Sequence, residues 1–171
     1  MRLTTRTNLA LRTLMFCAVN QEKLVRKQDA AQAINASENH LAQVINKLGQ
    51  DGFITTLRGR HGGFHLARDP SCISVGEVFR AFESGLPFME CFSTANTCPL
   101  KDHCVMRPHL SRAVESFYSA LDDLYLAELV HCNAGLEAIL SVEGPRIPKR
   151  CAPVQPDAPS DKALIAPELV D

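Results

Sequence analysis

Three cysteines within fourteen residues carry the most distinctive chemistry of this sequence. They are Cys91, Cys98 and Cys104, in the spacing C-x6-C-x5-C. Thiolates this close together can bind a metal ion or an iron–sulfur cluster, or form a disulfide in response to oxidation. Three ligands from one segment need a fourth from elsewhere to complete a four-coordinate site. The segment therefore predicts a metal, cluster or redox centre that another group completes.

The spacing favours an iron–sulfur cluster over zinc. Zinc sites usually contain C-x2–4-C pairs, and this segment has none. A cluster suits wider-set sulfurs, and Pro99 after Cys98 gives a Cys-Pro pair seen in other cluster proteins. A zinc-stabilised or thiol-switched DNA binder and a cluster-containing electron-transfer protein remain as alternatives. Cys17 lies in an apolar run and is expected to be a core residue.

Composition and charge narrow the class of protein. The chain has 171 residues and a net charge of −1, but residues 1–70 hold ten Lys or Arg against five Asp or Glu, and residues 71–171 hold eight against fourteen. A basic N-terminal half is typical of a DNA-binding module. No run approaches the roughly 20 apolar residues of a membrane span, and the first residues lack the apolar core of a signal peptide. We therefore expect a cytoplasmic protein with no membrane partner.

The N-terminal half has the pattern of a winged helix-turn-helix. Apolar residues recur with helical period over residues 5–20, 26–34 and 38–50. Two short strand-like runs follow, residues 53–57 and 64–66, and the six residues between them include three glycines. Helices followed by a glycine-tipped hairpin predict a mainly α fold with a small β-hairpin wing.

Two sets of polar side chains on these elements are candidates for DNA binding. Asn and Gln can form paired hydrogen bonds with adenine, Lys can contact phosphate, and Arg on a wing can enter the minor groove or contact phosphate. A solvated polar helix face is the alternative interpretation. The helix contributes Ser37, Asn39, His40, Gln43, Asn46 and Lys47, and the wing contributes Arg58, Arg60 and His61.

The remaining sequence divides into four predicted regions. Residues 1–83 form the DNA-binding domain, which ends in a helix started by a Ser-Val-Gly-Glu capping box at residues 74–77. Residues 84–105 form the cluster-binding loop. Residues 106–140 form a dimerisation helix region, because an isolated amphipathic helix needs a surface to bury its apolar stripe; packing of this helix within its own domain is the alternative. Residues 141–171 are a Pro-rich flexible tail, since six of the ten prolines lie beyond residue 144.

Several motifs together resemble one family, the Rrf-type bacterial transcription regulators. They are Met-Arg-Leu-Thr at residues 1–4, Leu-Ala-Leu-Arg at 9–12, the wing Arg-Gly-Arg-His-Gly-Gly at 58–63, Ile-Ser-Val-Gly-Glu-Val at 73–78, and the cysteine loop with its Cys-Pro-Leu. The resemblance covers residues 1 to about 140 and is closest to the NsrR and RirA branches. It implies a homodimer on a palindromic double-stranded DNA operator, with a cluster bound by the three loop cysteines. It also implies a nitric oxide (NsrR) or iron (RirA) signal that damages the cluster and releases DNA.

The chain departs from the family at the fourth ligand. Some NsrR-type members have an aspartate at position 8, donated from the partner subunit, and IscR-type members have a histidine at position 107; this chain has Asn8 and Arg107. Neither is a usual iron ligand. The fourth site is left to water, a small molecule or another residue such as His103 or His109, and Asn8 is a candidate contact to the partner's cluster. We expect a [4Fe–4S] cluster, with [2Fe–2S] as the alternative. We expect a nitric-oxide-sensing repressor, with an iron-responsive repressor as the alternative, and no enzyme, since no catalytic motif is present.

Overall fold

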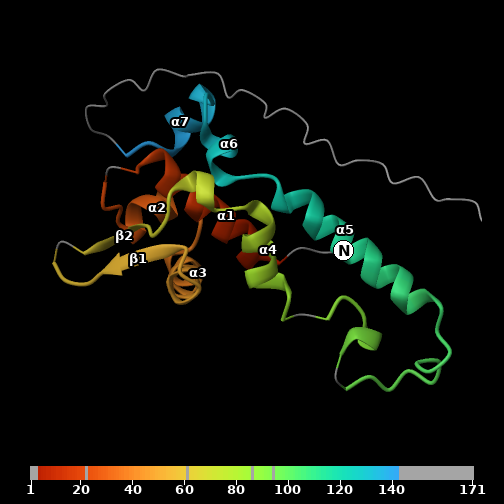
Figure 1. Cartoon of the computed structure of the whole chain (residues 1–171). Coiled ribbons are helices and arrows are strands. Elements are labelled where there is room, and N and C mark those ends of the chain that lie inside the picture. The colour runs from red at the N-terminus through yellow and green to blue at the C-terminus, as the bar shows by residue number, and fades with distance from the viewer. Residues whose placement is uncertain (1–3, 22, 61, 86, 94, 143–171) are drawn as a thin grey trace, which may run out of the picture.

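The computed structural model describes residues 4–21, 23–60, 62–85, 87–93 and 95–142. The elements are α1 (Thr5–Val19), α2 (Lys27–Ala33), α3 (Glu38–Gln50), β1 (Ile54–Leu57), β2 (Gly63–Leu66), η1 (Pro70–Cys72), α4 (Val75–Glu83), η2 (Glu90–Phe92), α5 (Met106–Asp122), α6 (Leu126–Val130) and α7 (Ala134–Leu140). This arrangement is a winged helix-turn-helix with a two-stranded hairpin and a long additional helix (Figure 1). The expected mainly α fold class is therefore confirmed.

The core forms around α1, which packs against α3, α4, α6 and α7. Leu14 and Phe16 on α1 are fully buried, and α3 contributes Leu41 and Leu48, which are also fully buried. The buried residues of α3 lie along one stripe, as the helical period predicted, whereas α1 is buried around most of its circumference, so Leu14 and Phe16 are both covered although they lie on different faces. The result is a helical core around α1 that fixes the direction in which the outer face of α3 points.

The turn after α3 and the wing depend on two glycines. Gly52 has φ +76°, a conformation that favours glycine, and it directs the chain from α3 into the buried Phe53. The strands pair antiparallel from Ile54 with Leu66 to Leu57 with Gly63. At Gly63 a Cβ would lie 2.5 Å from the Val25 carbonyl oxygen, so only glycine allows the segment before α2 to lie against β2. The hairpin is thereby anchored to the helical core.

The helix α4 begins where the sequence predicted, with half of the expected capping box. The Ser74 hydroxyl accepts a hydrogen bond from the Glu77 backbone N at 3.0 Å. The Glu77 carboxylate accepts instead from the Arg68 guanidinium at 2.8 Å. The box is therefore replaced by an N-cap plus an ion pair that ties α4 to the segment after β2.

After α4 the chain leaves the core and later returns to it. Helix α5 has no buried residue along its 17 positions and extends away from the winged domain (Figure 1). The chain then reverses, so that Leu126 of α6 and Leu140 of α7 are 1% and 6% exposed in the core. The buried Asn20 side chain donates to the Leu140 carbonyl at 2.9 Å and accepts from Val142 N at 3.0 Å.

These contacts divide the predicted 106–140 region into two parts with different environments. Only α5 extends from the domain, whereas α6 and α7 pack on α1. The sequence did not predict α7 as a separate helix. The predicted tail from residue 143 onward lies outside the described residues. None of the described helices is long and apolar enough to cross a membrane.

Candidate nucleic-acid interface and cysteine loop

The outer face of α3 is polar and exposed. Asn39, His40, Gln43 and Asn46 are exposed, whereas Leu41, Val44 and Leu48 on the opposite face are buried. Ser37 stands at the N-cap, is exposed and caps no backbone N–H with its side chain. The predicted helix residues therefore share one face, which can lie in a DNA groove while the apolar face holds the helix on α1.

Two basic residues that sequence reasoning did not assign to this face contact α3. The Arg6 Nη2 on α1 donates to the Gln43 Oε1 at 3.1 Å. Lys27 on α2 pairs with Glu38 at 3.1 Å, and both side chains are more than 40% exposed. The basic excess of residues 1–70 was the only sequence signal for them, because the contacts span distant positions.

Lys47 has a different environment from the rest of the face. Its ammonium pairs with Asp51 at 3.0 Å and lies 5.4 Å from the centre of the Phe82 ring on α4. A nearby carboxylate offsets much of the charge that a phosphate would attract. The predicted phosphate contact therefore competes with a pair already made within α3.

The wing presents its basic residues at an exposed tip. Arg58 and Arg60 are exposed on either side of Gly59, which has φ +116°. Gly62 N donates to the Gly59 carbonyl at 2.9 Å and closes the turn. His61, the third predicted wing residue, lies outside the described residues. The wing and the cysteine loop lie at opposite ends of the molecule in Figure 1.

The three loop cysteines are chemically suited to a cluster but are not assembled into a site. Cys91 lies in η2, Cys98 in the following loop and Cys104 two residues before α5; all three are free thiols of intermediate exposure. Among the described residues, no group of three or more His, Cys, Asp or Glu side chains is arranged to hold a metal ion. The residue types fit a thiolate-bound cluster, and binding would require the loop to close around it.

Local hydrogen bonds already constrain part of that loop. The Glu90 carboxylate accepts from the backbone N and the hydroxyl of Thr97, at 3.1 and 2.5 Å. These bonds lower the pKa of Glu90, and the bond from the Thr97 hydroxyl contributes most. Glu90 and Thr97 directly precede Cys91 and Cys98, so the bonds bring two of the three cysteine segments together.

A buried carboxylate connects the start of this loop to α1. Glu83, the last residue of α4, is 9% exposed and accepts from the Thr4 backbone N and hydroxyl, both at 2.9 Å, and from the Thr7 hydroxyl. Desolvation by burial raises the pKa of Glu83, but the three hydrogen bonds outweigh it and the net pKa is lowered. The first turn of α1 is thus fixed to the end of α4, directly before the cysteine loop.

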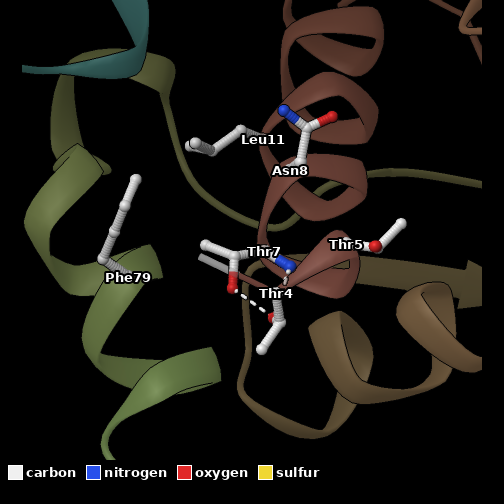
Figure 2. Close-up of a pocket in the computed structure, with 6 residues that line it drawn as sticks. All are labelled: Thr4, Thr5, Thr7, Asn8, Leu11 and Phe79. Carbon is white, nitrogen blue, oxygen red and sulfur yellow. Dashed lines mark hydrogen bonds between the residues drawn. The ribbon is translucent and has the colours of Figure 1, made fainter. Parts of the chain in front are cut away.

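Asn8 lies beside this junction on the rim of an open pocket. The pocket has a volume of about 300 Å³, and Figure 2 shows its lining, in which Leu11 on α1 points toward the side of Phe79 on α4 and Asn8 lies on α1 beside Leu11. Asn8 is exposed. An exposed amide next to a hollow is accessible to a second chain.

Helix α5 is attached to α4 through its C-terminal half. Arg80 on α4 pairs with Glu115 at 3.0 Å and with Asp122 at 2.7 Å. The rings of Phe79 and Phe117 meet edge to face at 5.8 Å. The N-terminal half of α5, which carries Arg107, continues from the cysteine loop (Figure 1). The loop is therefore attached to the domain through α4 at one end and α5 at the other.

An exposed polar helix next to a basic hairpin, held on a helical core, defines a DNA-binding protein of the winged-helix class. Residues 3–132 match the Rrf2 family, described as an iron-dependent transcriptional regulator. The chain belongs to this family.

Individual relatives agree with this assignment. The HTH-type transcriptional regulator NsrR of Geobacillus kaustophilus (strain HTA426) is 40% identical over 142 residues, which are 82% of this chain and 97% of that protein. Protein aau3 of Rhizobium meliloti (strain 1021) is 36% identical over 153 residues, which are 89% of this chain and 99% of that protein. The structure of T. potens IscR has a TM-score of 0.60 at 25% identity and covers 84% of this chain and 94% of IscR. These relatives confirm the predicted family and a transcription regulator rather than an enzyme.

Proposed function

We propose that this regulator is a homodimeric repressor that binds a palindromic operator and senses nitric oxide through a [4Fe–4S] cluster. One observation carries the proposal. Three free cysteines lie between α4 of the winged domain and the exposed helix α5, in a chain 40% identical to an NsrR. The cytoplasm is the expected location of such a protein.

The DNA-binding part of the proposal rests on α3 and the wing. The exposed residues of α3 would lie in the major groove, with the basic wing tip on the adjacent backbone or minor groove. Arg58 and Arg60 would contribute affinity for any DNA, whereas Asn39 and Gln43 would contribute base preference. The pairing of Lys47 with Asp51 favours a lesser role for Lys47.

The proposed cluster ligands are Cys91, Cys98 and Cys104. A bound cluster would cross-link the cysteine segments and supply a centre that reacts with nitric oxide. Asn8 and Arg107 are poor iron ligands, so the fourth position would be weakly held. Asn8 is exposed beside an open pocket, so it is accessible to the partner's cysteine loop, the contact that the family resemblance implies.

The dimer and the switch follow from the position of α5. A 17-residue helix with no buried position has an apolar stripe that α4 covers only in part, and the remainder is available to a second copy. Two α3 helices must lie about one DNA turn apart to read a palindrome. Because residues 84–105 join α4 to α5, closing the loop around a cluster would fix this spacing, and opening it would broaden the spacing.

The test begins with the anaerobically purified full chain. We expect a visible iron–sulfur absorption spectrum, with iron and sulfide in equal amounts. The cluster-loaded protein should bind its operator at least about tenfold more tightly than the cluster-free protein at the same salt, which is within typical coupling energies. Nitric oxide should reproduce the cluster-free affinity without separating the dimer in light scattering. A colourless zinc protein, or equal affinity in all states, would reject the proposal.

An iron-responsive repressor is the second candidate, favoured by the description of the matched family as iron-dependent. The two candidates differ in what releases DNA. Release by an iron chelator without nitric oxide, together with a cluster that survives nitric oxide, would favour iron sensing. Release by stoichiometric nitric oxide under iron-replete conditions would favour nitric oxide sensing.

A further inference from the structure

Arg6 is an exposed basic residue in the first turn of α1, and it lies against the middle of the DNA-facing side of α3. Its Nη2 donates to the Gln43 Oε1 at 3.1 Å, and both side chains are exposed. Gln43 lies near the midpoint of α3. The guanidinium of Arg6 therefore stands beside the helix that would occupy the major groove, although it belongs to a different element.

The backbone that carries Arg6 is anchored by the end of α4. The Glu83 carboxylate accepts from the Thr4 backbone N and hydroxyl, both at 2.9 Å, and from the Thr7 hydroxyl. Leu9, in the next turn of α1, is buried in the core. Because this turn is held on both sides of Arg6, only the side chain of Arg6 has to be ordered when it binds a ligand.

Arg6 differs from two other basic residues around α3 in having no carboxylate partner. Lys27 pairs with Glu38 at 3.1 Å. Lys47 pairs with Asp51 at 3.0 Å. Within the part of the chain that the structure describes, Arg6 forms no ion pair and bonds to a neutral amide. A guanidinium has five N–H donors and no acceptor, so one amide oxygen leaves its charge and most of its donors available to an anion.

A DNA phosphate is the anion that fits this position. The major groove is roughly 12 Å wide and is bordered by the phosphates of both strands, so the elements beside a helix in the groove meet the backbone. A planar guanidinium can bind a phosphate through two parallel hydrogen bonds. We propose that Arg6 binds a phosphate of the operator, so that α1 contacts DNA together with α3 and the wing. This inference rests on the proposed placement of α3 in the major groove.

The experiment measures the affinity of the anaerobically purified full-length chain for two double-stranded DNAs over a series of salt concentrations. One is an operator selected from a randomised pool, and the other is a random sequence. Arg6→Met removes the charge and should weaken binding to both DNAs by the same factor, roughly fivefold to tenfold per protomer at about 0.1 M salt. The salt slope should flatten by about one unit per protomer. Arg6→Lys retains the charge and should keep the wild-type slope.

Arg112→Met is the matched control for charge, because Arg112 is exposed on α5, where its Nη2 lies 2.7 Å from the His109 Nδ1. It should leave both affinities and the salt slope unchanged. An equal loss in Arg112→Met would show a general effect of net charge and would overturn the inference. Equal urea midpoints establish that each variant is folded.

Two outcomes would overturn the inference and leave the placement of α3 intact. A loss in Arg6→Met that is confined to the operator, with an unchanged slope, would show that Arg6 only positions Gln43. Wild-type affinities and slope in Arg6→Met, while Gln43→Ala and Arg58→Ala alter binding, would show that Arg6 does not contact DNA. No effect of any of these substitutions would overturn both the inference and the placement of α3.

Discussion

The winged domain and the α5 region differ in how much of their apolar surface is buried within the chain. In the winged domain, residues from α1, α3, the hairpin, α4, α6 and α7 form one continuous core. Helix α5 has no buried position, and the exposed large apolar side chains of the cysteine loop and its flanks include Phe88, Met89, Leu100, Val105 and Met106. The winged domain buries its apolar surface within one chain, whereas the α5 region leaves large apolar side chains exposed, which is consistent with the proposed dimer.

The polar groups repeat this contrast. Glu83, Asn20 and Thr13 are buried, and each has hydrogen-bond partners within the domain. No buried side-chain nitrogen or oxygen among the described residues lacks a partner. The loop thiols, by contrast, are free. The winged domain is thus held together by its own contacts, whereas the joined cysteine loop has free thiols through which it can bind a further group.

The strongest test of this contrast is a matched pair of leucine substitutions. Leu48→Ala removes a fully buried side chain from α3 and should cost about 2–5 kcal/mol in the free energy of unfolding. Leu110→Ala on the half-buried stripe of α5 should cost about 0.5 kcal/mol or less within one chain. Urea unfolding at low protein concentration measures both.

The dimer proposal adds a second readout to that pair. Leu110→Ala should weaken self-association in sedimentation equilibrium, whereas Leu48→Ala should act on folding. Equal losses of folding stability would show that α5 is part of the same core. An unchanged association constant in Leu110→Ala would argue against α5 as the interface.

A second test concerns the point where the two regions touch. A Cβ on Gly76 would lie 2.0 Å from the Asp122 Oδ1 and 2.8 Å from the Asp122 backbone N. Side-chain rotation cannot relieve the backbone contact, so Gly76→Ala should displace the end of α5 and cost about 1–3 kcal/mol. Gly85→Ala is the control, because nothing lies within 4 Å of its Cβ position. Thermal unfolding should separate the two, and equal midpoints would show that α5 is not closely held on α4.

Local sequence signals predicted the fold to within a few residues. The periodicity of residues 5–20 and 38–50, Gly52, the wing glycines and Ser74 each act within one turn or one hairpin, and the structure has α1, α3, the wing and α4 at these places. The return of α6 and α7 was not predictable in this way. It depends on contacts such as Asn20 with Leu140, which are 120 positions apart.

For the candidate site, too, the sequence indicated local features but not contacts between distant positions. Cysteines and a basic wing reveal their chemistry by residue type, so the sequence indicated them. The bonds of Glu83 with Thr4 and of Arg6 with Gln43 join residues 79 and 37 positions apart, and their local patterns are ordinary. The assignments of the metal and DNA residues stay predictions, because they depend on partners beyond one folded chain.

A third test uses pH at the junction between α1 and α4. The pKa of Glu83 is lowered from 4.5 in the folded state, so its ionised form stabilises the fold above about pH 4.5, and this contribution is lost as pH falls through the lower folded pKa. Glu83→Gln should cost about 1–2 kcal/mol at neutral pH, because a neutral amide accepts weaker hydrogen bonds. The difference from wild type should shrink in acid. Glu77→Gln, on a more exposed ion pair, is the control. Parallel stability curves for wild type and Glu83→Gln down to about pH 3 would contradict the assigned role of Glu83.

The last test, with the smallest expected effect, separates the ionic contacts from the apolar contacts that hold α5 on α4. Hydrogen bonds from Arg80 to Asp122, which contribute most, and to Glu115 raise the pKa of Arg80, so its charge persists across the accessible pH range. Salt tests the pair directly, because at about 1 M the Debye length falls to roughly 3 Å and exposed charges are screened. Arg80→Gln should lower the unfolding midpoint slightly at low salt, and this difference should nearly vanish at high salt.

Phe117→Ala is the control, because it removes the edge contact with Phe79, and apolar contact is not screened. Its effect should therefore persist at high salt. If the Arg80→Gln difference also persists at high salt, the guanidinium acts mainly through its stacking on the Tyr118 ring, 4.7 Å away, and the ion pairs do not set the angle of α5.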